Sequence, residues 1–177
     1  MSEAELERRL AAASAERAAA PPPLRPFGLV LLHDGSFRHE GEPIRNRKLR
    51  ERFDRSVVYL PAERVYVVKI GRFRGLIDVQ EAGFFVRSVD LERGRVLLSD
   101  GSSEELEASS LRPSPIDGAL LCRIRRDGVP EGLRARFLHA AHAELLAAVE
   151  STEAGAALRI AGRLVPLPPA LVDPRAD

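Results

Sequence analysis

The chain has 177 residues, of which 45% are apolar and 30% charged, a composition typical of a globular protein with one hydrophobic core. No apolar run is long enough for a membrane-spanning helix, and the single cysteine, Cys122, excludes an internal disulfide and a multi-thiolate metal site. Because the N-terminus carries Glu3, Glu5 and Glu7 instead of a signal or transit pattern, we expect a cytoplasmic protein with no membrane partner.

The net charge is only +1, but the charge is unevenly distributed along the chain. Residues 45–75 hold ten basic and three acidic side chains, which gives this stretch a charge of +7. Residues 76–117 hold four basic and nine acidic side chains, which gives a charge of −5. We expect the two stretches either to present charge to a partner or to neutralise each other within the fold.

The predicted organisation is one domain with two short appendages. Residues 1–26 are expected to form a helical or disordered leader, because Ser2 and Glu5 make a capping box and a proline linker follows at 21–23. Residues 27–168 are expected to form a single α+β domain, followed by a flexible, proline-rich tail at 169–177.

The domain opens with a predicted hairpin, in which Asp34-Gly35 turns the chain between residues 28–33 and 36–39. A short helix over 47–55 follows, with Asn46 as its N-cap and with Leu49 and Phe53 on its buried side. Alternating apolar residues then predict an antiparallel meander. Its strands are expected at 57–60, 65–70, 74–79, 84–91, 95–99, 106–109 and 120–126.

A long helix is predicted from Pro130 to about Glu150, because apolar residues recur there at i+4 spacing from Leu133 and Phe137 onward. A last hairpin is expected at 158–160 and 163–167. Strands followed by a covering helix, twice over, predict an α+β fold of meander sheets with two covering helices. The Leu-Arg-x-Arg-Phe pattern at 49–53 and 133–137 indicates either two duplicated strand-turn-helix units or a shared demand of secondary structure.

The sequence contains no recognisable catalytic apparatus. Glycine loops for nucleotide phosphates and nucleophile elbows are absent, and Cys122 falls in a strand pattern that favours burial over reactivity. His139 and His142, three residues apart on the predicted helix, are the best metal candidates, but the spacing supplies no third ligand. We therefore predict no catalytic residue, no metal and no other cofactor. His33 and His39 flank the first turn and are expected to face each other as surface residues.

The most unusual local stretch runs from residue 69 to residue 81, where cations, acids and two glycines gather at a strand turn. If a small anionic ligand binds this protein, we expect it here. The candidate ligand-binding residues are Lys69, Arg72, Arg74, Asp78 and Glu81. A charged hairpin end with ordinary salt bridges is the alternative interpretation.

Several short motifs carry a family resemblance. They are Asp34-Gly35-x-Phe37 with Gly41-x-Pro43-Ile44, the helix residues Leu49 and Phe53, Tyr66-Val67-Val68, the run 77–84, and the run 132–137. Together they resemble a bacterial family catalogued as domain of unknown function 1285 (DUF1285), over residues 27–167. The chain departs from the family pattern at 69–75, where the family has a Pro-x-Glu-Lys element, and at Gly83, where it has proline. The resemblance implies a compact fold of repeated strand-and-helix units and a ligand-binding or signalling role, and it implies no enzyme activity.

We accordingly expect a binding or signalling module that recognises a small, anionic ligand or a protein partner in a groove between sheet and helix. One alternative is a nucleic-acid-associated protein that uses the basic helix 47–55, although the few aromatic residues argue against nucleic acid as the partner. Another is an enzyme whose site brings His139, His142 and a distant acid together. No sequence pattern specifies an oligomeric state.

Overall fold

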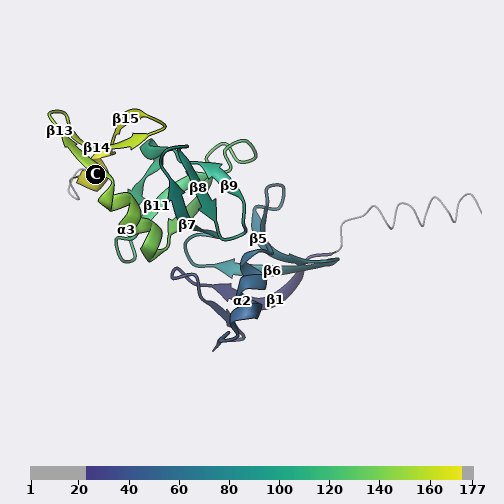
Figure 1. The fold of residues 1–177 in the computed structure, drawn as a ribbon. Coiled ribbons are helices and arrows are strands. Elements are labelled where there is room, and N and C mark those ends of the chain that lie inside the picture. Colours follow the sequence, from purple (N-terminus) through teal and green to yellow (C-terminus); the bar gives the residue numbers. More distant parts are fainter. Residues whose placement is uncertain (1–22, 173–177) are drawn as a thin grey trace, which may run out of the picture.

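Three β-sheets form the framework of the protein, as the computed structural model of residues 23–172 shows (Figure 1). The first sheet has the strand order β3-β2-β1-β6-β5-β4, and β1 and β6 are its one parallel pair. Its strands are β1 (Arg25–Leu31), β2 (Phe37–His39), β3 (Glu42–Pro43), β4 (Val57–Leu60), β5 (Val65–Ile70) and β6 (Phe73–Val79). Helix α2 (Arg47–Asp54) connects the two edge strands β3 and β4.

The second sheet has the order β10-β11-β12-β7-β8-β9, with β7 and β12 as its parallel pair. Its strands are β7 (Phe84–Asp90), β8 (Arg95–Leu98), β9 (Ser103–Glu105), β10 (Arg112–Pro113), β11 (Leu120–Ile124) and β12 (Leu133–Phe137). A short 3₁₀ helix, η1 (Ala108–Ser110), connects the edge strands β9 and β10.

The two six-stranded sheets repeat one chain path. In each, three strands step outward as a meander, a helical segment crosses to the other edge, and three strands step back until the last lies parallel to the first. The predicted doubling is therefore present, but its unit is six strands and a helical segment. The proposed correspondence of 49–53 with 133–137 is wrong, because the first segment lies in α2 and the second is β12.

Helix α3 (His139–Ala147) and the third sheet complete the fold at its C-terminal end. The third sheet is an antiparallel meander of β13 (Val149–Thr152), β14 (Gly155–Ile160) and β15 (Arg163–Pro166), followed by the short helix α4 (Pro169–Val172). Helix α3 packs against β7 and β12, with Ala141 and Leu145 buried. Figure 1 shows α3 beside the second sheet and the third sheet beyond it, at the end of the molecule far from α2.

One hydrophobic cluster runs through both six-stranded sheets. It includes Phe37 and Phe53 from the first sheet and α2, and Phe84 and Leu98 from the second sheet. Cys122 belongs to the same cluster and is buried, as the strand pattern predicted. The predicted α+β class is confirmed. None of the helices in residues 23–172 has the length and apolar character needed to cross a membrane.

Several predicted elements agree closely with the observed ones. The first hairpin, the strands at 57–60 and 65–70 and the last hairpin are present, and Asn46 caps α2 by accepting a hydrogen bond from the Leu49 N–H group at 3.2 Å. Leu49 itself is exposed, so only Phe53 forms the buried side of α2. The predicted leader, residues 1–26, lies outside the described residues as far as residue 22, and β1 begins within it at Arg25. In the predicted tail, residues 169–172 form the short helix α4, and residues 173–177 lie outside the described residues.

Two predicted elements are wrong. The helix expected from Pro130 to Glu150 is β12 followed by the shorter helix α3, because Leu133, Ala135 and Phe137 are buried at the two-residue spacing of a strand. The strand expected at 106–109 is also wrong, because Asp100-Gly101 makes so short a turn that β9 is already complete at Glu105.

His33 and His39 do not face each other. His39 pairs with Leu29 in the β1–β2 ladder, whereas His33 lies in the turn, where its main-chain N–H group donates a hydrogen bond to Gln80 Oε1 at 2.9 Å.

Candidate functional site

A predominantly apolar cavity of about 490 Å³ lies between α3, α4 and the third sheet. This volume is within the range of small-molecule sites in proteins. Its lining residues are Pro113, Gly118, Leu120, His142, Leu145, Leu146, Val149, Ala156, Leu167, Ala170, Leu171 and Val172. The cavity is therefore a groove between a helix and a sheet, the kind of place where the sequence led us to expect a ligand.

The rim of this cavity exposes apolar surface to water. Leu146 on α3 and Val172 on α4 are 55% and 56% exposed, the highest values among the large exposed apolar side chains of residues 23–172. Leu145, beside Leu146, is fully buried on the inner side. Two such side chains at one opening form a patch that favours an apolar partner or ligand.

Local hydrogen bonds hold the walls of the cavity in place. The N–H group of Leu167 donates to the carbonyl of Ala156 at 2.9 Å and so fixes the chain between β15 and α4 against β14. On the opposite wall, the N–H group of Gly118 donates to the carbonyl of Ser114 at 2.9 Å. Gly118 has a φ of +77°, a conformation that residues with a side chain rarely adopt.

His142 is the one lining residue of the cavity with an ionisable side chain. Burial lowers the pKa of His142, and the nearby His139 and Arg136 lower it further, while Asp117 acts in the opposite direction. The net effect keeps this pKa below its ordinary value of 6.5, so the imidazole is neutral at pH 7. A neutral imidazole both donates and accepts one hydrogen bond, and it marks the polar end of an otherwise apolar space.

A buried ion pair lies close to this polar end. Arg136 on β12 donates through Nη1 to Glu81 Oε2 at 2.6 Å and through Nη2 to Asp117 Oδ2 at 2.5 Å. The side chains of Glu81 and Arg136 are 2% and 7% exposed, whereas that of Asp117 is 42% exposed. Ser114 Oγ donates to the second oxygen of Glu81 at 2.5 Å.

This cluster joins the two six-stranded sheets. Glu81 lies on the connection from β6 to β7, and Asp117 lies on the β10–β11 loop that forms one wall of the cavity. His33, in the turn after β1, approaches Asp117 with its Nε2 atom at 4.0 Å from Asp117 Oδ2. Burial lowers the pKa of Arg136, but hydrogen bonds to Asp117 and Glu81 more than compensate and raise it overall. The guanidinium group is thus bound by two carboxylates and ties the β10–β11 loop to β12.

The five predicted ligand residues do not converge on one site. Glu81 is held by Arg136, and Asp78 is exposed on β6 opposite Val30. Lys69 is exposed on β5 and pairs across the hairpin with Arg74, which contacts Glu63 at 3.4 Å. Arg72 and Arg74 do line a common space, a small cavity of about 210 Å³ at the start of β6.

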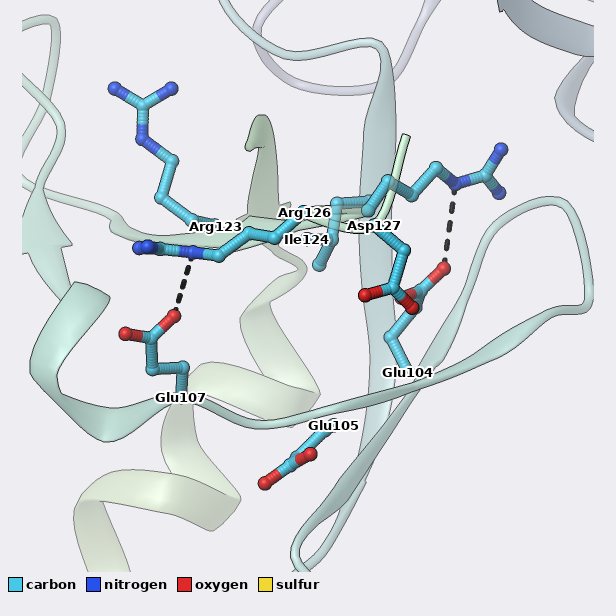
Figure 2. Close-up of a pocket in the computed structure, with 8 residues that line it drawn as sticks. Glu104, Glu105, Glu107, Arg123, Ile124, Arg126 and Asp127 are labelled. Atoms are coloured by element: carbon cyan, nitrogen blue, oxygen red, sulfur yellow. Dashed lines mark ion pairs between the residues drawn. The ribbon is translucent and has the colours of Figure 1, made fainter. Parts of the chain in front are cut away.

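Figure 2 shows a further, charged cavity of about 240 Å³, where residues 104–107 face residues 123–127. Arg126 Nε pairs with Glu107 Oε2 at 2.7 Å, and Arg125 Nε lies 3.5 Å from Glu104 Oε1. The guanidinium of Arg125 also stacks over the Phe84 ring, 4.1 Å from its centroid. Two of the three arginines that line this cavity are thus already paired with glutamates, so a ligand would have to compete with these ion pairs.

The other sequence candidates show no assembled chemistry. His139 and His142 both lie on α3, but residues 23–172 contain no group of three or more His, Cys, Asp or Glu side chains placed to hold a metal ion. Burial raises the pKa of Cys122 to about 12, which leaves the thiol unreactive at neutral pH. On the basic helix α2, Arg47 is paired with Glu51 at 2.8 Å.

Sequence reasoning identified His142 and Glu81 but missed Arg136 and the cavity. Arg136 is 55 residues away from Glu81, so only the fold brings them together. No local pattern marked Arg136, because it alternates with the inward-facing Ala135 and Phe137 and is therefore expected on the outward face of β12.

Comparison with known proteins identifies the fold. No protein-family model matches the chain, and no curated protein matches it. A solved DUF1285 family protein from Silicibacter pomeroyi DSS-3 is 17% identical, with 85% of each chain covered and a TM-score of 0.59. A second DUF1285 family protein, from Shewanella baltica OS155, is 14% identical over 68% of this chain and 91% of that one, with a TM-score of 0.45. The first likeness shows that the chain has a DUF1285-like fold, as its motifs predicted.

Proposed function

We propose that this protein is a binding module for a small amphipathic molecule, whose apolar part occupies the cavity between α3, α4 and the third sheet. The observation that carries the proposal is the pairing of a 490 Å³ apolar cavity with the two most exposed large apolar side chains, Leu146 and Val172, at its rim. Covering these side chains with ligand removes apolar surface from water, which is favourable in proportion to the area buried.

The polar end of the ligand is placed by His142. Arg136 is already bound to Glu81 and Asp117, so the cluster offers no spare positive charge to an anionic group. The neutral imidazole instead favours a hydroxyl, amide or protonated carboxyl group on the ligand. The anionic character expected from the sequence therefore does not extend to this cavity.

A competition experiment tests the proposal. The fluorescence of anilinonaphthalene sulfonate is titrated with the folded protein, and n-decanol is then added to displace the probe. We expect saturable binding and displacement. Ala156 lies half-buried on β14 and lines the cavity, so Ala156→Phe should fill the space and abolish probe binding.

The matched control is Ala154→Phe, because Ala154 is exposed in the turn before β14 and does not line the cavity. We expect this variant to bind the probe as the natural protein does. Equal binding by all three proteins, or loss of binding in the Ala154 variant alone, would contradict the proposal. The His142→Leu variant should retain the fluorescent probe and bind n-decanol less tightly, because it removes only the polar contact.

A further inference from the structure

The small cavity at the start of β6, on the first sheet, is lined by three arginines, a proline and a phenylalanine. It has a volume of about 210 Å³, and its lining residues are Pro23, Arg25, Arg72, Phe73 and Arg74. Arg25 begins β1, and the other two arginines flank the start of β6, which runs parallel to β1. Two adjacent strands therefore bring three arginines to one small space.

Acidic side chains of residues 23–172 balance the charges in this space only in part. Arg74 contacts Glu63 at 3.4 Å, whereas Arg25 and Arg72 have no ion pair with any residue of 23–172. Arg25 and Arg72 therefore bring two positive charges that no acid of the described residues pairs. This differs from the cavity in Figure 2, where Arg125 and Arg126 are each paired with a glutamate.

The backbone around these arginines is well defined. Ile70 and Phe73 pair across the β5–β6 hairpin, so Gly71 and Arg72 form a two-residue turn, and the φ of +57° at Gly71 suits such a turn. Phe73 packs edge-on against Phe27, with ring centroids 5.1 Å apart.

Gly75 makes this aromatic packing possible. A Cβ atom at position 75 would lie 2.7 Å from Phe73 Cε1 and 2.9 Å from Phe27 Cβ, closer than real Cβ contacts. Any larger residue would therefore displace the rings that support the cavity. The site is built before a ligand arrives, which reduces the entropy lost on binding.

We propose that this cavity binds a compact oxyanion with two or more negative charges, namely a phosphate or diphosphate group of a small molecule. Guanidinium groups recognise phosphate oxygens through paired, charge-assisted hydrogen bonds, and arginine is suited to this geometry where lysine is not. The two positive charges of Arg25 and Arg72 match a dianion. The site is separate from the apolar cavity, so the test of this proposal does not depend on the outcome for the proposed function.

The test is isothermal titration of the full-length protein with inorganic diphosphate at low ionic strength, with sodium acetate at matched ionic strength as the comparison. We expect saturable binding of diphosphate and much weaker binding of acetate. The Arg25→Gln and Arg72→Gln variants should each weaken diphosphate binding roughly tenfold. Both side chains are exposed, so the variants should unfold at the same temperature as the natural protein when no anion is present.

Arg163→Gln is the matched control, because Arg163 is an exposed arginine at the start of β15, away from this cavity. It should leave diphosphate affinity unchanged. Undetectable diphosphate binding, an equal loss in the Arg163 variant, or acetate binding as tight as diphosphate would overturn the assignment. Tighter binding of a single-stranded oligonucleotide than of diphosphate would also overturn it, because the phosphate would then belong to a nucleic acid backbone. Probe binding in the apolar cavity should be the same in all of these variants.

Discussion

The buried ion pair between Glu81 and Arg136 allows a sharp stability prediction. Glu81→Leu removes the carboxylate that is 2% exposed and leaves the Arg136 guanidinium with Asp117 as its remaining carboxylate partner. Removing one partner of a buried pair costs about 3–5 kcal/mol, because the other charge stays buried without full compensation. Since Asp117 still contacts Arg136, we expect a cost of about 3 kcal/mol, at the lower end of this range.

The double variant Glu81→Leu with Arg136→Met tests whether this loss of stability comes from the buried Arg136 charge that the single variant leaves without Glu81. An apolar pair of similar volume has no buried charge to compensate, so the double variant should recover most of the stability that the single variant loses. The exposed pair of Glu150 and Arg159, with atoms 3.0 Å apart and side chains 43% and 54% exposed, is the control. Glu150→Leu should cost less than about 1 kcal/mol.

Thermal unfolding followed by circular dichroism measures all four proteins. In a domain of this size, each kcal/mol lowers the melting temperature by roughly 2–4 °C, so Glu81→Leu should lower it by roughly 6–12 °C. The reasoning is refuted if Glu81→Leu is no more destabilising than Glu150→Leu, or if the double variant is less stable than Glu81→Leu alone.

Three further predictions follow from individual residues. A hydrogen bond from Arg136 is the main reason that the pKa of Asp117 falls from 3.8 to about 2, so the stability it contributes is present above pH 3.8 and is lost as the pH falls toward 2. Acid unfolding should therefore depend less on pH in this range in Asp117→Asn, and an unchanged profile would count against the contact. Because burial raises the pKa of Cys122 to about 12, iodoacetamide should label this thiol only after unfolding, and rapid labelling of the native protein would contradict its burial. In Gly83→Ala the new Cβ atom would lie 2.2 Å from Tyr66 Cε1, so urea unfolding should show a loss of about 1–3 kcal/mol, whereas Gly128→Ala, with open space around it, should show none.

The fold was predictable from sequence where the determinants are local. Asp34-Gly35 supplies the tight turn of the first hairpin, and an asparagine at 46 caps the helix that follows. The apolar pattern at 133–137 led to the wrong prediction of a helix. Residues four apart also satisfy a period of two, so Leu133 and Phe137 fit a helix and a strand equally well. Only the pairing of β12 with β7 and β11 decides between them.

The candidate site was only partly predictable, because its walls come from distant parts of the chain. Pro113 and Val172 line the same cavity although 59 positions separate them, and no local pattern connects them. His142 stood out because histidines three apart on a helix share a face, yet its significance comes from the apolar side chains around it. In the stretch 69–81, two of the candidate residues, Arg72 and Arg74, line one cavity, but the sequence could not show that Glu81 is bound to Arg136.

Methyl-resolved nuclear magnetic resonance of the natural protein during titration with n-decanol tests the binding module most directly. We predict that the methyl resonances of Leu145, Leu146 and Leu167, which line the cavity, shift and saturate together. Those of Leu29 and Leu31, in the core of the first sheet, should stay in place. Shifts spread evenly over all leucines, or none that saturate at the cavity, would contradict the account.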